Sequence, residues 1–409
     1  MLIVQKFGGS SVVNAVRITS VARRIAETFR KGNQVVVVLS AQGGTTDKLI
    51  HMANEINPNP SKRELDMLLA TGEQQSVALM AMALQKLGLS AVSLTGQQIG
   101  LYTSSSYGSA RIRRIDAERI YTELERNNIV IVAGFQGVNR FGDITTLGRN
   151  SSDVTAVALA AVLKADLCEI YSDVSGVYTA DPHIVKNARK MEQISYDEML
   201  ELASQGAKIL ASRSVELAKK YQVALVVRSS MSEEEGTVVK EEAKVESTYI
   251  SGLAIDKDVA SISVIGVRNE PGMAYRIFSL LAKDKIVVDI ILQSIGRGAT
   301  KDIAFTVTKS DLHRAVKLIS DSKHKLGFES ITYDDKIVKV SVVGAGMASH
   351  PGVASMMFEA LYAGGINIMM ISTSEIKISV LIDEREADAA VNSIHERFFS
   401  GSEARKDSF

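Results

Sequence analysis

The chain has little of the residue types that stabilise secreted proteins or anchor membrane proteins. Cys168 is the only cysteine among 409 residues, so no internal disulfide can form, and a cytoplasmic protein is expected. The longest apolar runs, such as residues 156–163, fall well short of the roughly 20 residues that a membrane span needs. Lys6 interrupts the apolar start of the chain, and a signal peptide is therefore not expected.

Net charge and metal-binding patterns are also missing. The 47 Lys and Arg residues balance 47 Asp and Glu residues, so a nucleic-acid partner is not expected. The six His residues are scattered, with no H-E-x-x-H motif or Cys/His cluster, and no protein-built metal site is predicted. P-loop and protein-kinase signatures are absent as well, so any phosphate chemistry would use another scaffold.

Up to about residue 230, short apolar stretches alternate with helical patterns. Strands are expected at residues 2–6, 34–40, 90–95, 130–135, 167–172 and 223–227, and helices at 16–31, 46–56, 64–87, 152–164 and 195–222, the last as two helices. This alternation predicts an α/β domain with an open, mostly parallel sheet and helices on both faces.

A charged, serine-rich stretch ends this pattern, and an internal repeat follows it. We place the first domain at 1–230 and a linker at 231–249. Pro271-Gly272 opens one helix and Pro351-Gly352 opens another, each between β-rich stretches. The repeat predicts two small βαββαβ modules, at 250–330 and 331–409.

The stretch most informative about function is LIVQKFGGSS, residues 2–11. A strand leads into Gly8 and Gly9, and a helical pattern follows. Backbone without Cβ atoms can turn tightly and point N–H groups at an anion, while Lys6 and the helix N-terminus add positive charge. The segment predicts a phosphate cradle. An ordinary strand–turn–helix with a serine cap is the alternative that these residues alone leave open.

Further polar segments follow other expected strands, where open parallel sheets bind their ligands. They are SAQGGTTD at 40–47, TTLGRNSSD at 145–153 and YSDVSGVYTADP at 171–182, with Glu73 on a nearby helix. Arg149 offers a planar fork to a carboxylate, and Ser152 can cap a helix. One carboxylate and one guanidinium suit the ammonium and carboxylate of an α-amino acid.

KFGGSS at 6–11, the segments at 145–153 and 171–182, and the C-terminal repeat together resemble the aspartate kinase family over essentially the whole chain. The resemblance implies an amino-acid-kinase fold followed by two ACT domains. It also implies ATP-dependent phosphorylation of the side-chain carboxylate of L-aspartate to 4-phospho-L-aspartate, the first step toward lysine, threonine and methionine. Mg²⁺ would be carried on the ATP phosphates. Another amino-acid or carbamate kinase of the same fold, and a non-catalytic amino-acid sensor on an inactive kinase domain, are the alternatives.

The resemblance also implies the roles of individual residues. Lys6 and Asp153 would be catalytic. ATP would be bound by Lys6, Gly8, Gly9, Ser40, Ser172, Asp173, Tyr178 and Lys208, and aspartate by Thr46, Glu73 (its ammonium), Arg149 (its α-carboxylate) and Ser152. Two positions depart from the family pattern: Asn150-Ser151 stand where many members have Gly-Gly, and Ala211-Ser212 where many have His-Pro. Neither departure removes a charged group, and we expect both to adjust the activity rather than abolish it.

The resemblance of the C-terminal modules to ACT domains implies a homo-oligomer that is inhibited by threonine, lysine or both. Each Pro-Gly helix start offers free N–H groups to a carboxylate, and a polar residue follows in the next strand. The resemblance implies a threonine pocket formed by Gly272, Met273, Ala274, Asp289 and Gln293 with Asn367 and Ile368, and a lysine pocket formed by Met347, Ser349 and His350 with Ser374 and Glu375. Asn269 stands where many relatives have Asp, which removes one charge for a lysine ammonium.

Overall fold

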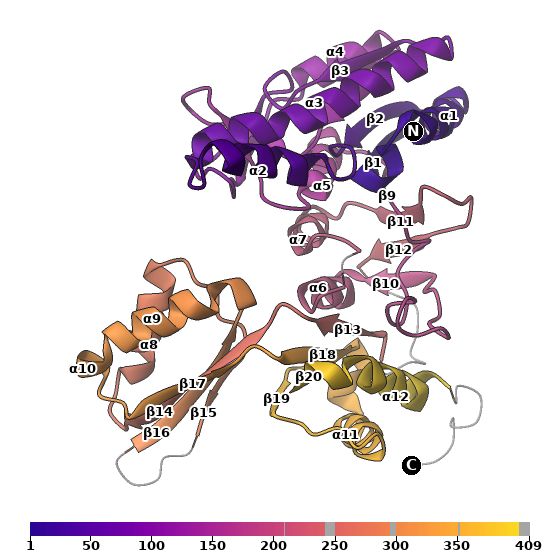
Figure 1. Ribbon diagram of the computed structural model, residues 1–409. Coiled ribbons are helices and arrows are strands. Elements are labelled where there is room, and N and C mark those ends of the chain that lie inside the picture. Colours follow the sequence, from indigo (N-terminus) through magenta and orange to yellow (C-terminus); the bar gives the residue numbers. More distant parts are fainter. Residues whose placement is uncertain (208, 242–249, 295–299, 351, 401–409) are drawn as a thin grey trace. The chain divides into compact units, whose positions relative to one another are not determined.

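The computed structural model describes residues 1–207, 209–241, 250–294, 300–350 and 352–400 (Figure 1). These residues form two compact units. The first contains Met1–Tyr178, Arg189–Ala203 and 209–241. The second contains Thr179–Ala188, Ser204–Ala207 and the described residues from 250 onward. Lys208 and the side chain of Ser349, both named above as site residues, lie outside the part of the chain that the structure describes.

An eight-stranded sheet forms the centre of the first unit. Two of its central strands, at residues 34–39 and 129–133, consist largely of β-branched apolar residues that are buried on both faces, as expected for parallel strands covered by helices. All neighbouring strands are parallel except β11 and β12, which confirms the predicted sheet. The spatial order is β10 (Gln193–Ser195), β12 (Thr237–Lys240), β11 (Leu225–Ser229), β9 (Leu167–Ser172), β1 (Leu2–Phe7), β2 (Gln34–Leu39), β6 (Ile129–Ala133) and β3 (Ala91–Leu94).

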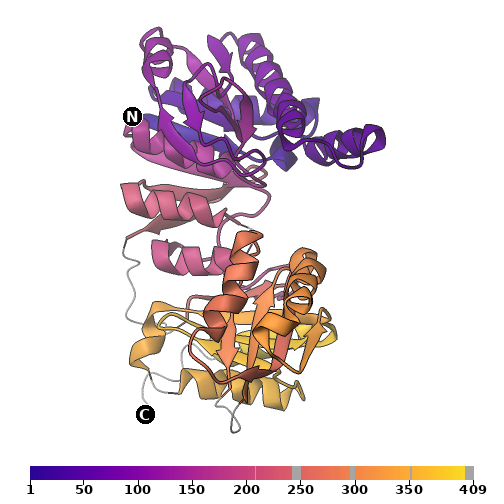
Figure 2. The ribbon, with the colours of Figure 1, turned by 90° about the vertical axis from the view of Figure 1, so that its left-hand side faces the viewer.

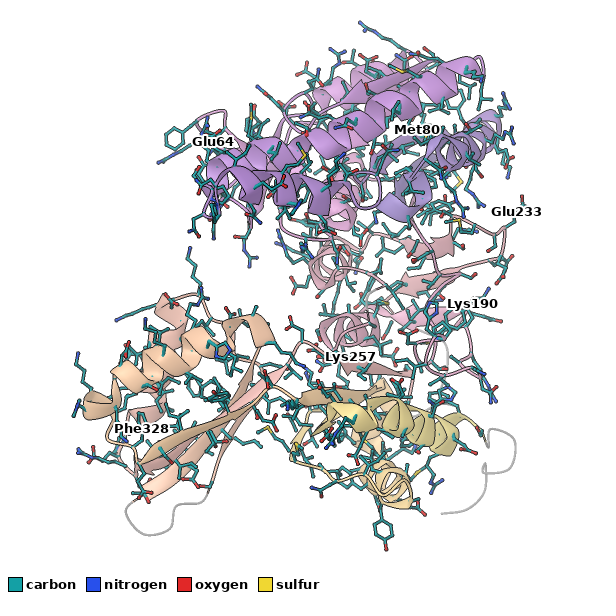
Figure 3. The ribbon with its side chains drawn as sticks, in the orientation of Figure 1. Glu64, Met80, Lys190, Glu233, Lys257 and Phe328 are labelled. Carbon is teal, nitrogen blue, oxygen red and sulfur yellow. The ribbon has the colours of Figure 1, made fainter. Side chains whose placement is uncertain are left out.

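Helices cover both faces of this sheet, because successive side chains of a strand point to opposite faces. On one face α1 (Ala15–Arg30) and α3 (Lys62–Lys86) bury Ile25 and Met80 against strand residues such as Val37 (Figures 1 and 3). On the other face α5 (Ser152–Leu163) contacts β1, β2 and β9, and α7 (Ser212–Tyr221) packs on α5. Since α5 is covered from both sides, nearly all its residues are buried.

The first unit also contains further helices and a second sheet. The residues expected to form two helices at 195–222 form α6 (Tyr196–Ser204) and α7. The sequence analysis did not anticipate a small second sheet, because its strands have only three or four residues each. The further elements are η1 (Gly9–Val12), α2 (Thr45–Ile56), α4 (Glu118–Glu125), and the second sheet in the order β5 (Ile112–Ile115), β4 (Leu101–Thr103), β7 (Gln136–Val138) and β8 (Ile144–Thr146).

The second unit contains the two modules that the repeat predicted, each an antiparallel four-stranded sheet with helices (Figures 1 and 2). Module 1 has the sheet order β15 (Ile291–Gln293), β16 (Thr300–Val307), β14 (Ala260–Arg268) and β17 (Ser330–Asp334), with η2 (Lys309–Asp311), α8 (Met273–Lys283), α9 (Leu312–Asp321) and α10 (Lys323–Leu326). Module 2 has the order β13 (Gly252–Asp256), β18 (Ile337–Val343), β20 (Lys377–Asp383) and β19 (Met370–Thr373), with η3 (Ala345–Ser349), η4 (Glu384–Glu386), α11 (Val353–Ala363) and α12 (Ala387–Phe399).

The strand pairing changes the module boundaries expected from the repeat. β13, which the sequence analysis assigned to the first module at 250–330, pairs instead with β18 of module 2. β17 reaches Asp334, beyond the expected end of the first module, and pairs with β14. Module 1 is thus inserted between the first two strands of module 2. The physical reason is that Leu253 buries its side chain in the apolar core of module 2.

Candidate functional site

The strand register places the predicted loops at one edge of the large sheet. Phe7 of β1 is level with Leu39 of β2 and with Tyr171 of β9, and Leu39 is level with Ala133 of β6. The loops that leave these four strands therefore begin side by side at the carboxyl edge. The residues that follow the four level positions are Gly8, Ser40, Gly134 and Ser172, of which Ser172 is the last residue of β9. This is the position at which open parallel sheets bind ligands.

The glycine loop after β1 lies against the loop after β2. Gly43 N–H donates to the Gly9 carbonyl at 3.0 Å. A Cβ atom on Gly9 would lie 2.7 Å from the Ala41 carbonyl oxygen, so only glycine allows this close approach. Asn14, rather than a serine, caps α1 by accepting from Arg17 N–H, so the serine cap expected in the alternative is wrong. Ser11 instead donates to Ser230 at 2.8 Å.

Lys6 and Asp153 form a mostly buried ion pair beside this loop. Lys6 Nζ lies 2.7 Å from Asp153 Oδ1, and the side chains are 12% and 7% exposed. Ala211 N–H donates to the other carboxylate oxygen of Asp153 at 3.3 Å. Asp153 therefore links the end of β1 to the first turns of α5 and α7. Ala211 and Ser212, one of the two departures from the family pattern, keep this backbone donor and begin α7.

Glu73 presents a carboxylate with one unoccupied oxygen toward the loop after β2. It lies on α3 and is 4% exposed. Ala41 N–H donates to its Oε1 at 3.0 Å, while Oε2 has no hydrogen-bond partner among the described residues. Burial raises the pKa of Glu73 to about 7, although the Ala41 N–H favours the charged form. A Cβ on Gly72 would lie 2.8 Å from that of Ala41, so Gly72 lets the helix approach the loop.

Arg149 lies in the loop before α5 and reaches Asp47 in the first turn of α2. The contact measures 2.8 Å, but the side chains are 78% and 76% exposed, so it contributes little stability. The guanidinium is thus accessible to a ligand close to Thr46. Asn150 has φ +57°, a left-handed conformation that asparagine tolerates better than most residues. This accommodates the Asn150-Ser151 departure.

The loop after β6 holds Ser152 close to the sheet. A Cβ on Gly134 would lie 2.7 Å from Ser152 Oγ, so the small residue leaves room for the hydroxyl. Phe135 has φ +69°, and its N–H donates to Thr155 Oγ1 at 3.2 Å. α5 is thereby fixed to the edge of the sheet by its first turn.

The predicted nucleotide side follows β9. Ser172 donates to Asp173 at 2.9 Å, and Asp173 is exposed. Tyr178 forms an isolated β-bridge with Lys190, whose position Figure 3 marks. Cys168, on the strand before this loop, is buried, and burial raises the pKa of its thiol.

Two residues that position the site were missed by the sequence analysis. Asp66 is 1% exposed and accepts from Gly108 N–H and Thr146 N–H, both at 2.9 Å. Its place seven residues before Glu73 on the inner face of α3 was an available signal. Arg213 donates to the Leu147 carbonyl at 2.7 Å and so supports the Arg149 loop. The sequence gives no signal of this role for Arg213, because its position on the helix looks like that of a surface residue.

In the second unit, the structure gives Asp289 a partner that the sequence did not reveal. Lys339 on β18 is 3% exposed and forms ion pairs with Asp289 and, at 3.6 Å, with Asp256. Gly272 precedes the first residue of α8 and has φ +89°, a left-handed conformation that favours glycine. The next residue, Met273, is buried. Of the remaining proposed effector contacts, Ala274 lies in the first turn of α8, Met347 in η3 and Gln293 at the end of β15. The others lie outside helices and strands: His350, Asn367, Ile368, Ser374 and Glu375.

Two whole-molecule features complete the description. Within the described residues, no group of three or more His, Cys, Asp and Glu side chains is arranged to hold a metal ion. None of the helices in that part of the chain combines the length and the hydropathy of a transmembrane span.

Comparison with known proteins assigns each half of the chain to a family. Residues 1–229 match the model of the amino acid kinase family, and residues 262–322 and 340–398 match that of the ACT domain. The chain is 51% identical over 404 residues to the aspartokinase of Geobacillus stearothermophilus, with 98% of each chain covered. It is 50% identical over 408 residues to that of Corynebacterium glutamicum, covering 98% of this chain and 97% of the relative.

Solved structures agree with this assignment. The aspartate kinase from Synechocystis is 43% identical and matches with a TM-score of 0.56 over 100% of this chain and 71% of its own. Escherichia coli aspartokinase III in complex with aspartate and ADP matches with a TM-score of 0.86 over 98% of this chain and 100% of its own. At 24% identity, the second comparison concerns the fold alone.

Proposed function

The chain belongs to the amino acid kinase family and, within it, to the aspartokinases, and from this premise we propose how its residues carry out the reaction. An aspartokinase transfers the γ-phosphoryl group of ATP to the side-chain carboxylate of L-aspartate. That carboxylate is already ionised at neutral pH, so no general base is needed. Catalysis then consists of positioning the substrates and stabilising the charge of the transferring group.

The observation that carries the proposal is the buried ion pair of Lys6 and Asp153 beside the glycine loop. In our proposal the Lys6 ammonium and the N–H groups of Gly8 and Gly9 stabilise the phosphate oxygens of ATP. Asp153 holds Lys6 in place, since its carboxylate is itself fixed by the backbone of Ala211. A group held in advance does not have to reorganise when charge develops, which is the basis of this kind of catalysis.

We assign the amino-acid substrate to the loops after β2 and before α5. Glu73 would accept the substrate ammonium through its unoccupied oxygen, and Arg149 would bind the α-carboxylate as a bidentate fork. Thr46 and Ser152 would orient the side-chain carboxylate toward the glycine loop. The nucleotide would extend along Ser40, Ser172, Asp173 and Tyr178, with Lys208 as a further contact.

The donor set fits magnesium as a cofactor bound mainly by ATP. Mg²⁺ in kinases is usually held by phosphate oxygens, water and one or two carboxylates. The carboxylates beside these loops include Asp153, which is engaged by Lys6, and the exposed Asp173. Asp173 and neighbouring hydroxyls would hold the ion through the phosphates. When bound, the ion neutralises phosphate charge.

For the ACT-type modules we propose feedback inhibition by threonine, lysine or both, in a homo-oligomer. The edge strands β15 and β19 support the pairing of modules between chains, because both carry exposed apolar residues such as Ile291 and Ile371. Unpaired strand edges of this kind can pair with another copy of the sheet. The Asp289 and Gln293 side chains would then contact the effector close to this edge.

A coupled assay of ADP release tests the catalytic proposal. The purified protein is offered aspartate, glutamate and carbamate with ATP and Mg²⁺, and hydroxylamine traps any acyl phosphate as a hydroxamate. We expect release and hydroxamate with aspartate, and neither with the Lys6→Ala variant. Release with glutamate or carbamate instead would assign the chain to another kinase. No release with any acceptor would favour the non-catalytic sensor.

A further inference from the structure

At two places the chain leaves the catalytic unit and joins the regulatory unit. Residues Thr179–Ala188 and Ser204–Ala207 belong to the second unit, although the chain on either side of each belongs to the first. The first of these segments directly follows the proposed nucleotide loop, Ser172–Tyr178. Tyr178 is held in the first unit by its bridge with Lys190. The boundary between the units is therefore a single peptide bond away from a proposed ATP contact.

Hydrogen bonds attach the start of the first segment to module 2. Leu253 N–H of β13 donates to the Thr179 carbonyl at 2.7 Å. The Thr179 hydroxyl hydrogen-bonds to His395 Nε2 of α12 at 2.9 Å, and both residues are buried. Asn392, one turn before His395, donates to the Ile184 carbonyl at 3.3 Å. Backbone and side-chain contacts thus hold the segment between β13 and α12.

The same segment contributes to the apolar core of module 2. Ala180 and Val185 are each 3% exposed and belong to the cluster that includes Met347. Ile368 packs against that cluster. Met347 and Ile368 are two of the proposed effector contacts. A rearrangement of these side chains on effector binding would therefore displace Ala180 and Val185, because close-packed cores transmit displacement.

The second segment, Ser204–Ala207, also makes close contacts with module 2. Ser341 of β18 donates to Gln205 at 3.1 Å. Gly206 has φ +108°, and a Cβ there would lie 2.3 Å from the Ile255 carbonyl oxygen of β13. No residue with a side chain fits this approach. β13 thus contacts both segments.

We propose that residues 179–188, the strap, transmit the state of module 2 to the nucleotide loop through the peptide bond between Tyr178 and Thr179. This inference rests on the proposed effector site. An effector that favours one arrangement of the module 2 core shifts the strap, and the shift alters the geometry of Ser172 and Asp173. The strap is joined to the nucleotide loop by a peptide bond and to module 2 by packing in its core. The coupling therefore requires no new contact between the units.

The test is to remove the hydroxyl bond while keeping the volume of the side chain, with Thr179→Val. Thr179→Ser retains the hydroxyl and serves as the conservative variant. Ser379→Ala, which removes another buried hydroxyl of module 2 outside the strap, is the matched control. The full-length proteins are assayed for aspartate-dependent ADP release with increasing threonine or lysine. Hydrogen exchange of the amides in residues 172–178 is measured with and without each effector.

We expect Thr179→Val to keep a turnover without effector close to that of the wild type. The concentration of effector that halves the rate should rise about fivefold or more, the lower end of typical couplings between sites. The effector-induced change in exchange at 172–178 should shrink in parallel. Thr179→Ser and Ser379→Ala should behave like the wild type. Should Thr179→Val fail to fold, Val185→Ala tests the same strap through its core contact.

Inhibition and exchange changes in Thr179→Val or Val185→Ala that equal those of the wild type would overturn the inference. The proposed catalysis is judged separately, by whether the wild type phosphorylates aspartate. If it does not, the exchange measurement still tests the strap, since that readout needs no turnover. If threonine or lysine inhibits the wild type without changing exchange at 172–178, the strap is refuted and the effector site stands. If neither amino acid inhibits the wild type or changes its exchange, the effector site is refuted, and the strap with it.

Discussion

Replacing Glu73 with glutamine should stabilise the unliganded protein while weakening its binding of aspartate. Glutamine keeps an oxygen for the Ala41 N–H and nearly the same volume, but carries no charge. The wild-type carboxylate has a folded-state pKa raised from 4.5 to about 7 by burial. At about 1.4 kcal/mol for each pH unit, this difference corresponds to ~3 kcal/mol of destabilisation by the buried charge.

The pH dependence of this effect has a defined sign. A folded state with the higher pKa binds its proton more tightly than the unfolded chain. The destabilisation by Glu73 is therefore fully present above pH 7, declines as the pH falls from about 7 to 4.5, and is absent below that. Glu73→Gln should accordingly be more stable than the wild type at pH 8 and about equally stable near pH 4.5.

Denaturant unfolding of the first unit across this pH range measures the effect, with and without aspartate. Glu64→Gln, on the same helix but with a side chain 64% exposed, is the matched control and should show no such trend (Figure 3). Added aspartate should stabilise the wild type more than Glu73→Gln, and the aspartate KM of the wild type should rise as the pH falls below 7. A Glu73→Gln variant that is no more stable than the wild type at pH 8 would refute the reasoning.

Three further substitutions test the other roles. Lys6→Ala should raise the activation free energy by ~3–4 kcal/mol and so lower turnover, with little change in aspartate KM. A variant that keeps more than about a tenth of the turnover would exclude Lys6 from the mechanism. Arg149→Lys keeps the charge but loses the fork, so steady-state kinetics should show a strongly raised aspartate KM and a similar ATP KM; the opposite pattern would place Arg149 on the nucleotide. Asp289→Ala and Gln293→Ala should relieve threonine inhibition in the same assay while sparing turnover, and unchanged inhibition would contradict the assignment. Gln293→Ala is the cleaner of the two, because Asp289→Ala also deprives the buried Lys339 of a partner.

Patterns within short stretches of the sequence predicted the structural features that depend only on neighbouring residues. The valine run of β2 is buried on both faces, as its uniform apolarity indicated. Gly8 and Gly9 followed by a helical pattern predicted a turn at the strand end, and the register places that turn at the carboxyl edge of the sheet. The two Pro-Gly helix starts predicted equivalent elements in both modules, and α8 and α11 each begin at a glycine with positive φ.

Other features depend on contacts between residues far apart in the chain. Nothing local distinguishes Glu73 from a solvated glutamate on a helix, because its burial results from the approach of α3 to the loop after β2. Lys339 looks like a polar residue in an edge strand, yet it is buried between Asp256 and Asp289. The raised pKa of Glu73 and the counter-ion of Asp289 could not be predicted for this reason.

The sequence by itself determined the main helices and strands of the first unit, the parallel sheet and the residue types at its carboxyl edge, because these follow from hydrophobic periodicity and backbone chirality over a few neighbouring residues. The tertiary structure alone decided that β13 pairs with β18 rather than with module 1, and that residues 179–188 leave the catalytic unit for the core of module 2. Strand partners and core partners compete for the same apolar surface across the whole chain. The free energy of burial selects among them only when every element is present.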